Sequence, residues 1–203
     1  MGREENVEIF QDTERLCKSH PVLTAGIEKS AKQQKLILEG EEVLVSGAPE
    51  YNETARVIVS KKRSYEAASA YAGGKVCVLN FASATNPGGG VVRGSSAQEE
   101  CLCRCSTLYF GLNAEPMWQG FYGPHRAEKN PLHNDDCIYT PEVIVFKTDT
   151  ASPKLMAEAE WYKVNVITCA APNLRANPGN IMNPGEGDRQ IKLTEKELLG
   201  FHE

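Results

Sequence analysis

The residues with the clearest chemical potential form one cluster in the first half of the chain. Asn80 and Asn86 lead to three consecutive glycines at positions 88–90, and the run Gln98-Glu99-Glu100 follows after seven more residues. Glycines let a backbone approach a bulky anion closely because they have no Cβ. A helix that begins at residue 98 would add free N–H groups and a positive dipole end, which favour phosphate. Carboxylates beside such a cradle indicate cleavage of a bond in a phosphate-bearing molecule.

The flanking residues predict the elements that hold this cluster. Residues 75–80 are apolar and partly β-branched, which predicts a central strand covered on both faces. The amphipathic run over residues 98–112 predicts a helix. Strand, glycine loop and helix in this order are typical of α/β proteins that bind nucleotides at the carboxyl ends of strands. The cluster therefore lies where a nucleotide site is expected.

The rest of the chain predicts further elements of an α/β fold. Two helices are expected between residues 5 and 39, the second over residues 24–38, and another over residues 64–71. Strands are expected at residues 43–45, 55–59 and 164–169, with two short ones between residues 137 and 146. Residues 113–136 and 173–189 predict long irregular loops. In the first loop, Trp118, Phe121 and Tyr122 either face a ligand or anchor the loop to the core.

The order of these elements suggests how the chain is divided. We expect an N-terminal helical extension over residues 1–50 and an α/β core over residues 51–203. Thr194 and Glu197 form a capping box that opens a helix close to the last residue, Glu203. A helix in that position normally leads to another strand, so the core is expected to be incomplete at its C-terminus.

The bulk composition limits the classes of function. The chain has 203 residues, of which 41% are apolar and 24% charged, as in one ordinary globular domain. The net charge of −5 argues against direct DNA binding and favours a pocket that takes one end or one unit of a polyanion. No apolar run approaches the roughly 18 residues of a membrane span, and the N-terminus lacks a signal peptide. We expect a cytoplasmic protein without a membrane partner.

The cysteines do not predict a metal site. Cys101, Cys103 and Cys105 alternate with other residues, and no second cluster has ligand spacing. Alternate residues of a helix do not share a face, so the three thiols cannot easily converge on one ion. Seven cysteines in a chain of this kind are expected to be buried and reduced.

The spacing of the glycines and the acidic residues resembles the signature of poly(ADP-ribose) glycohydrolases, in which Gly-Gly-Gly precedes Gln-Glu-Glu by six to eight residues. Residues 78–90, Val-Leu-Asn-Phe-Ala-Ser-Ala-Thr-Asn-Pro-Gly-Gly-Gly, resemble the microbial branch, and residues 168–174 resemble a later strand of it. The resemblance spans most of the chain. It implies a macrodomain-like mixed sheet flanked by helices, poly(ADP-ribose) or an ADP-ribosylated molecule as substrate, and ADP-ribose as product.

The resemblance also implies roles for single residues. It makes Glu100 the catalytic acid/base, while Glu99 hydrogen-bonds the sugar hydroxyls that are being separated. The other implied contacts to substrate come from Gln98, Gly88, Gly89, Gly90, Asn80 and Asn86. Some relatives carry Asp at position 80 and Asn at position 83, where this chain has Asn80 and Ser83.

The implied reaction is hydrolysis of a ribose–ribose O-glycosidic bond, which needs a proton for the leaving oxygen and a base for the water. Adjacent residues on a helix diverge by about 100°, so Glu99 and Glu100 cannot flank the bond symmetrically. One carboxylate is expected to make both proton transfers, without a metal or cofactor. A helix N-terminus lowers the pKa of a carboxyl and burial raises it, so we expect Glu100 to become a competent acid mainly when substrate is bound.

Three hypotheses from different classes stay open. The first is a hydrolase that releases ADP-ribose from poly(ADP-ribose). The second is a hydrolase of another ADP-ribosyl bond, on protein, nucleic acid or a metabolite, because the sequence indicates the acid and not the leaving group. The third is a module that binds ADP-ribose without turnover, which the intact Gln-Glu-Glu run argues against.

Overall fold

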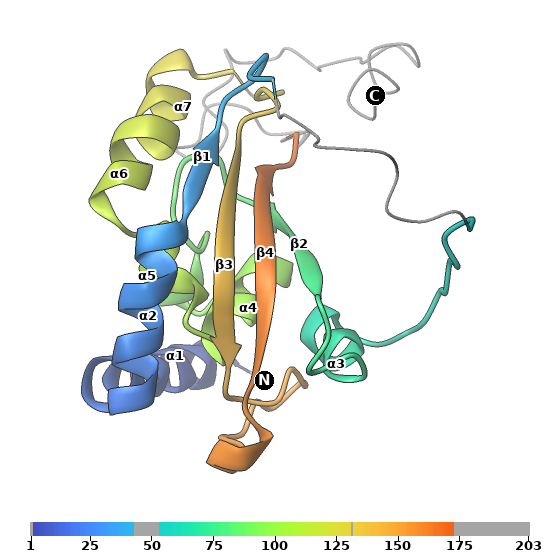
Figure 1. The fold of residues 1–203 in the computed structure, drawn as a ribbon. Coiled ribbons are helices and arrows are strands. Elements are labelled where there is room, and N and C mark those ends of the chain that lie inside the picture. The colour runs from blue at the N-terminus through green and yellow to red at the C-terminus, as the bar shows by residue number, and fades with distance from the viewer. Residues whose placement is uncertain (1, 43–52, 131, 173–203) are drawn as a thin grey trace.

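The computed structural model describes residues 2–42, 53–130 and 132–172, and these residues form a mixed α/β fold (Figure 1). Its sheet contains, in spatial order, β1 (Lys35–Ile37), β3 (Cys137–Val145), β4 (Tyr162–Ala170) and β2 (Cys77–Ala82). β2 runs parallel to β4, and the other two pairings are antiparallel. The prediction of a mixed sheet flanked by helices is therefore confirmed.

Seven α-helices and three shorter turns of helix surround this sheet in the described part of the chain. The α-helices are α1 (Arg3–Ser19), α2 (Pro21–Gln33), α3 (Ser64–Ser69), α4 (Gln98–Cys105), α5 (Leu108–Leu112), α6 (Glu115–Met117) and α7 (Gly123–Glu128). The shorter turns are η1 (Val91–Arg93), η2 (Trp118–Tyr122) and η3 (Glu158–Glu160). α4 lies behind the strands in the view of Figure 1.

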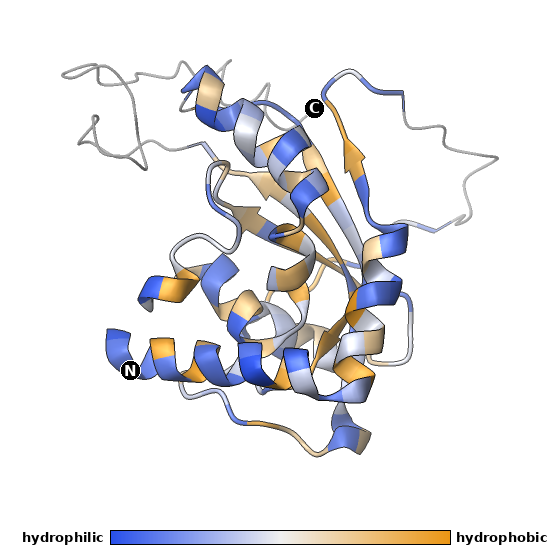
Figure 2. Ribbon diagram, turned by 90° about the vertical axis from the view of Figure 1, so that its left-hand side faces the viewer, coloured by the Kyte–Doolittle hydropathy of each residue, from blue (hydrophilic) through white to orange (hydrophobic). Residues whose placement is uncertain are grey.

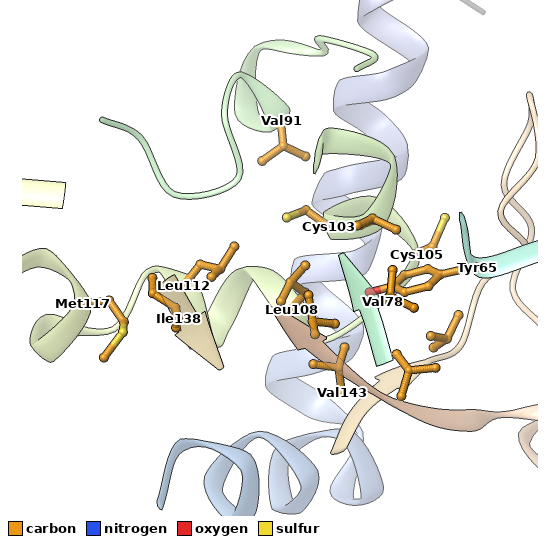
Figure 3. Packing of buried hydrophobic residues seen from close by; sticks show 14 of the residues in the cluster. Tyr65, Val78, Val91, Cys103, Cys105, Leu108, Leu112, Met117, Ile138 and Val143 are labelled. Carbon is orange, nitrogen blue, oxygen red and sulfur yellow. The ribbon is translucent and has the colours of Figure 1, made fainter. Parts of the chain in front are cut away.

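The main core lies between the sheet and the helices α4 and α5. Alternate strand residues such as Val78, Ile138 and Val143 point into it and meet Leu102 and Leu108 from the helices (Figure 3). Burial of each such side chain contributes about 1.5–3 kcal/mol, so this cluster fixes α4 against the sheet. Hydrophobic residues are concentrated along the strands, whereas the N-terminal helix alternates in hydropathy as an amphipathic helix does (Figure 2).

β2 differs from its prediction as a central, doubly covered strand. It forms an edge of the described sheet, with β4 as its neighbour. Val78, Asn80 and Ala82 are buried on one face, whereas Leu79 and Phe81 on the other face are 45% and 60% exposed. The physical reason is that the face of Leu79 and Phe81 is left exposed by the described residues, so burial alternates along the strand although the residues are mostly apolar.

Two predicted helices have different ends in the structure. The second N-terminal helix ends at Gln33 instead of residue 38, because residues 35–37 pair with β3 as a strand. The helix predicted over residues 98–112 is split into α4 and α5 at Ser106. The Ser106 hydroxyl donates to the Leu102 carbonyl at 2.9 Å and accepts the Leu108 N–H at 3.2 Å, which replaces the helical pattern locally.

Three further predictions are corrected. Residues 55–59 form no strand and are exposed, with Val57 85% and Val59 93% accessible and no strand partner among the described residues. Residues 113–136 contain α6, η2 and α7 instead of an irregular loop. The two strands expected around residue 141 are one strand, β3, with a register shift between Thr140 and Val143. Such a bulge bends a strand without ending it.

Some of the remaining predictions are confirmed, and others concern residues that the structure does not describe. The first N-terminal helix, the helix from residue 64 and the strand over residues 164–169 correspond to α1, α3 and β4. The strand at residues 43–45, the loop at 173–189 and the capping box at 194–197 lie outside the described residues. β1 belongs to the sheet although it precedes residue 50, and a domain division at that residue stays a prediction. Among the described helices, none has the length and apolarity needed to cross a membrane.

Candidate active site

The glycine loop packs directly against the first turn of α4. The Gly90 N–H donates to Glu100 Oε1 at 2.8 Å, and the Ser83 N–H donates to Glu99 Oε2 at 2.8 Å. The loop after β2 therefore holds both carboxylates of the motif by backbone hydrogen bonds. The structure brings together the two parts of the sequence cluster, as their spacing predicts.

Gly89 shows why this loop needs glycine. Its φ of +59° lies in the left-handed region, which side chains with a Cβ rarely adopt. A Cβ at this position would lie 2.6 Å from Glu100 Oε1 and 3.0 Å from Glu99 Oε2. The close approach that the sequence indicated is thus first of all an approach to the two carboxylates.

The N–H groups of the last two glycines are engaged within the protein. Gly89 donates to the Asn86 carbonyl at 2.9 Å, while Gly90 donates to Glu100 as described. These two groups do not point freely toward an incoming phosphate. Gly89 and Gly90 offer no side chain, so they would not block the close approach of a ligand.

Both glutamates are buried, and each keeps one oxygen without a partner. Glu99 is 3% and Glu100 6% exposed. Glu99 Oε1 and Glu100 Oε2 have no hydrogen-bond partner among the described residues. A buried carboxylate oxygen without a donor is costly, so each is a strong acceptor for a ligand hydroxyl. A protonated carboxyl at either position can instead donate.

Burial sets the protonation state of Glu99. Desolvation raises the pKa of this carboxyl to about 8, the Ser83 N–H opposes the shift, and the charge of Glu100 adds to it. Burial therefore outweighs the helix N-terminus, which favours the anion. Glu99 is mostly protonated at neutral pH and can donate a hydrogen bond from its carboxyl group.

Asn80 lies beneath the carboxylates and ties two strands together. Its side chain is fully buried, and its amide donates to Thr168 Oγ1 on β4 at 3.2 Å. The two residues are register partners in the parallel pair of β2 and β4. Asn80 Oδ1 has no partner among the described residues, so it stays available to the site.

Gln98 is fastened to the outer edge of β2. Its Oε1 accepts the Phe81 N–H at 2.8 Å, and its Nε2 donates to the Leu79 carbonyl at 2.7 Å and to Ser64 Oγ at 3.1 Å. The amide thus takes the place of a neighbouring strand at the edge of the sheet that the described residues form. These contacts fix the start of α4 on β2, a task that the sequence did not indicate.

Arg126 on α7 holds the loop from the other end, and sequence reasoning missed it. Its Nε donates to the Thr85 carbonyl at 2.6 Å and its Nη2 to Asn86 Oδ1 at 2.8 Å. The guanidinium carbon lies 4.6 Å from the centre of the Trp118 ring, in cation–π geometry. The only sequence signal is an arginine eight residues after a tryptophan, which does not identify the loop as its partner.

The aromatic residues of segment 113–136 resolve into two groups. Phe121 and Tyr122 are fully buried in the main core, so they anchor the segment. Trp118 is half-buried and supports Arg126 at the loop. The hypothesis that these rings anchor the segment is therefore the one that the structure supports for Phe121 and Tyr122.

The cysteines are all free thiols, as predicted, but they are not all buried. Cys17, Cys103 and Cys105 are buried, whereas Cys77 is exposed on the open face of β2. The other three, Cys101, Cys137 and Cys169, are half-buried. In the described part of the chain, no group of three or more His, Cys, Asp or Glu side chains is placed to hold a metal ion.

The described residues form a mixed α/β fold in which a strand, a glycine loop and a helix enclose a buried pair of carboxylates. The chain belongs to the family described as microbial-type PARG, catalytic domain, whose profile matches residues 4–148. PARG stands for poly(ADP-ribose) glycohydrolase. The resemblance stated from the sequence is confirmed.

Solved structures of this family share the fold. The poly(ADP-ribose) glycohydrolase of Thermomonospora curvata is 32% identical with a TM-score of 0.68, over 85% of this chain and 66% of that one. The same enzyme bound to the inhibitor ADP-HPD gives 30% identity and a TM-score of 0.67, over 85% of this chain and 65% of that one. The enzyme of Deinococcus radiodurans in complex with ADP-ribose is 29% identical with a TM-score of 0.59, over 73% of this chain and 59% of that one.

The matches cover only part of the length of the solved enzymes. This chain spans about two thirds of the length of the Thermomonospora curvata enzyme, 66% in the first comparison. No curated protein matches the chain. The comparisons therefore establish the family and the fold of this chain.

Proposed function

We propose that this chain is a poly(ADP-ribose) glycohydrolase domain that hydrolyses ribose–ribose O-glycosidic bonds and releases ADP-ribose. Its family membership and its likeness to enzymes of this name support the proposal. The observation that carries it is the state of Glu100. This carboxylate is buried and held by the Gly90 N–H through one oxygen, while its other oxygen has no partner among the described residues.

In the proposed mechanism Glu100 makes both proton transfers. It gives a proton to the leaving ribose oxygen as the glycosidic bond breaks, and it then takes a proton from the attacking water. The single tether through Oε1 fixes the carboxyl while Oε2 stays open to the reacting atoms.

The neighbouring residues orient the substrate. Glu99, protonated at neutral pH, donates to a ribose hydroxyl and accepts from another through its free oxygen. Gly88, Gly89 and Gly90 give the distal ribose and the diphosphate a surface without side chains. Asn86 contacts the ribose, and its side chain is held by Arg126, which donates to Asn86 Oδ1.

The decisive experiment measures ADP-ribose released from purified poly(ADP-ribose) by the wild type and by Glu100→Ala. We expect release by the wild type alone, with ADP-ribose affinity of the variant within about tenfold. Glu115→Ala, which removes an exposed glutamate on α6, is the matched control and should stay active. A fully active Glu100→Ala protein would rule out this mechanism.

The same assay separates the other two hypotheses. Release from an ADP-ribosylated protein, nucleic acid or metabolite, but not from the polymer, would identify a different leaving group. Tight binding of ADP-ribose without turnover of any of these would identify a binding module. The free thiols favour a reducing compartment, so the cytoplasm is the proposed place of action.

A further inference from the structure

A cavity of about 220 Å³ lies beside α4 and is not part of the carboxylate site described above. Its polar lining comes from Asn6, Arg63, Ser96, Cys101, Arg104 and Thr150. Cys101 and Arg104 belong to α4, the helix whose first turn carries the two glutamates. The cavity therefore contains two arginines, although the chain has a net charge of −5.

Arg104 is a buried cation without a carboxylate partner. It is 1% exposed, and in the described part of the chain it forms no ion pair. Its Nη1 donates to the Ser95 carbonyl at 2.5 Å, its Nη2 to Cys101 Sγ at 3.3 Å, and its Nε has no partner. Burial of an uncompensated charge is strongly unfavourable. A counter-ion in the adjoining cavity would supply the missing charge.

Glu100 does not compensate Arg104, although the two are four residues apart on one helix. An acidic and a basic residue at this spacing can pair across a helical turn. In this structure Glu100 is turned to the Gly90 N–H, ten residues away in sequence. The requirement for a carboxylate at the glycine loop thus leaves the guanidinium of Arg104 without its nearest intrahelical partner.

Arg63 brings a second guanidinium to the same cavity. Its Nη1 donates to Cys101 Sγ at 3.4 Å and lies 3.7 Å from Asp149 Oδ1. Asp149 also accepts the Tyr65 N–H at 3.0 Å, so it is held in place beside Arg63. The Glu66 carboxylate also lies beside Arg63 and accepts its backbone N–H at 3.3 Å. The lining of the cavity itself contains the two arginines and no acidic residue among the described residues, so it is positively charged.

We propose that this cavity is an oxoanion site that binds a phosphate group. Guanidinium groups present planar sets of N–H donors that match phosphate oxygens, and the Ser96 and Thr150 hydroxyls complete the lining. The proposal does not depend on the proposed hydrolase activity. The phosphate can come from solution or from a neighbouring ADP-ribose unit of a bound polymer, and the test below separates these sources.

Cys101 supplies a local readout that does not depend on turnover. Its thiol receives hydrogen bonds from both arginines, so an anion between them would shield it. The experiment measures alkylation of each cysteine by neutral iodoacetamide, followed by peptide mass spectrometry, with and without inorganic phosphate at constant ionic strength. Cys77, exposed on β2 and away from the cavity lining, is the internal control.

We expect phosphate to slow alkylation of Cys101 by about fivefold and to leave Cys77 unchanged. In Arg63→Ala this protection should be lost, so that the rates of alkylation with and without phosphate become about equal. Arg56→Ala, which removes an exposed arginine elsewhere, should keep the wild-type protection. No slowing at Cys101, or equal slowing in Arg63→Ala, would overturn the proposal.

The source of the phosphate follows from a second series with oligomers of ADP-ribose. Protection of Cys101 at a lower concentration of phosphate groups than inorganic phosphate needs would identify the polymer as the source. Equal concentrations would identify free phosphate. Because labelling is read from the thiol, a failure of hydrolysis and a failure of this site give separate results.

Discussion

Gly90 and Glu100 are joined by a 2.8 Å hydrogen bond from the backbone N–H of the glycine to Oε1 of the glutamate. The spacing of the glycine triplet and the acidic run is the length of chain that lets the loop turn back onto the first turn of α4. In the described part of the chain, Glu100 Oε2 has no partner. The loop therefore holds in place the carboxylate that we propose as the acid/base.

Gly89→Ala should reduce activity much more than stability. The new Cβ would lie 2.6 Å from Glu100 Oε1, so the carboxylate must move. Displacement of a catalytic group by a fraction of an ångström to an ångström costs on the order of 10²-fold in rate. The left-handed backbone adds about 1–3 kcal/mol of strain. The measurement is kcat/KM together with the free energy of unfolding from urea denaturation.

Gly40→Ala is the matched control for this experiment. Gly40 also has a positive φ, +77°, but no atom lies within 4 Å of a Cβ placed there. The Gly40→Ala variant should lose stability through backbone strain and keep the kcat/KM of the wild type. Equal losses of activity in the two variants would show that the clash with the carboxylates is not what matters.

Parts of this site follow from sequence and others do not. The start of α4 at Gln98 and its closeness to the glycines are predicted, because spacing and residue type carry that information. The break at Ser106 depends on a side chain that bonds Leu102 and Leu108 within the folded helix pair, and periodicity does not reveal it. Arg126 is missed for a similar reason, since its partners lie 40 and 41 residues away.

Glu99→Gln should change how stability depends on pH. The pKa of Glu99 is about 8 in the folded protein and 4.5 for an ordinary glutamate. Between these values the folded state holds one more proton than the unfolded state, so the free energy of unfolding falls as pH rises. Glutamine does not titrate, so the variant should gain stability relative to wild type by a few kcal/mol from pH 5 to pH 9.

Urea denaturation at several pH values measures this difference directly. Glu115→Gln, an exposed glutamate with the same chemical change, should follow the wild-type curve. If Glu99→Gln and the wild type instead keep a constant difference across the range, Glu99 is ionised in the folded protein and cannot donate to a ribose hydroxyl at neutral pH.

Arg126→Ala should weaken substrate binding more than catalysis. The guanidinium bonds Thr85 and Asn86, which precede the glycines, and it does not contact either glutamate in the described structure. Loss of two partly exposed hydrogen bonds of about 0.5–1.5 kcal/mol each predicts a rise in KM of about fivefold with little change in kcat. Steady-state kinetics on poly(ADP-ribose) would measure the two constants separately.

Arg126→Lys and Arg56→Ala test the cause of that effect. Lysine keeps the charge but not the fork of N–H donors, so Arg126→Lys should resemble Arg126→Ala. Arg56→Ala removes an exposed arginine outside the site and should leave KM unchanged. Full rescue by lysine would mean that charge near the ligand, and not the hold on the loop, determines KM.

Gln98→Ala separates a structural role from a role in sugar binding. Its amide bonds the Phe81 N–H and the Leu79 carbonyl at the free edge of β2. Removal should lower the free energy of unfolding by about 1–2 kcal/mol, because two backbone groups lose their partners. In Gln98→Glu a carboxylate oxygen would face the Leu79 carbonyl oxygen in place of the amide N–H, so this variant should lose at least as much stability as Gln98→Ala.

The kinetic result decides between the two roles of Gln98. If the amide acts on the edge of β2, the free energy of unfolding falls in both variants. The change in KM for poly(ADP-ribose) then corresponds to a smaller free energy than the loss of stability. If the amide instead binds the sugar hydroxyls, stability stays at the wild-type value while KM rises about tenfold in Gln98→Ala. Since the contacts at 2.7 and 2.8 Å occupy both ends of the amide, we expect the first outcome.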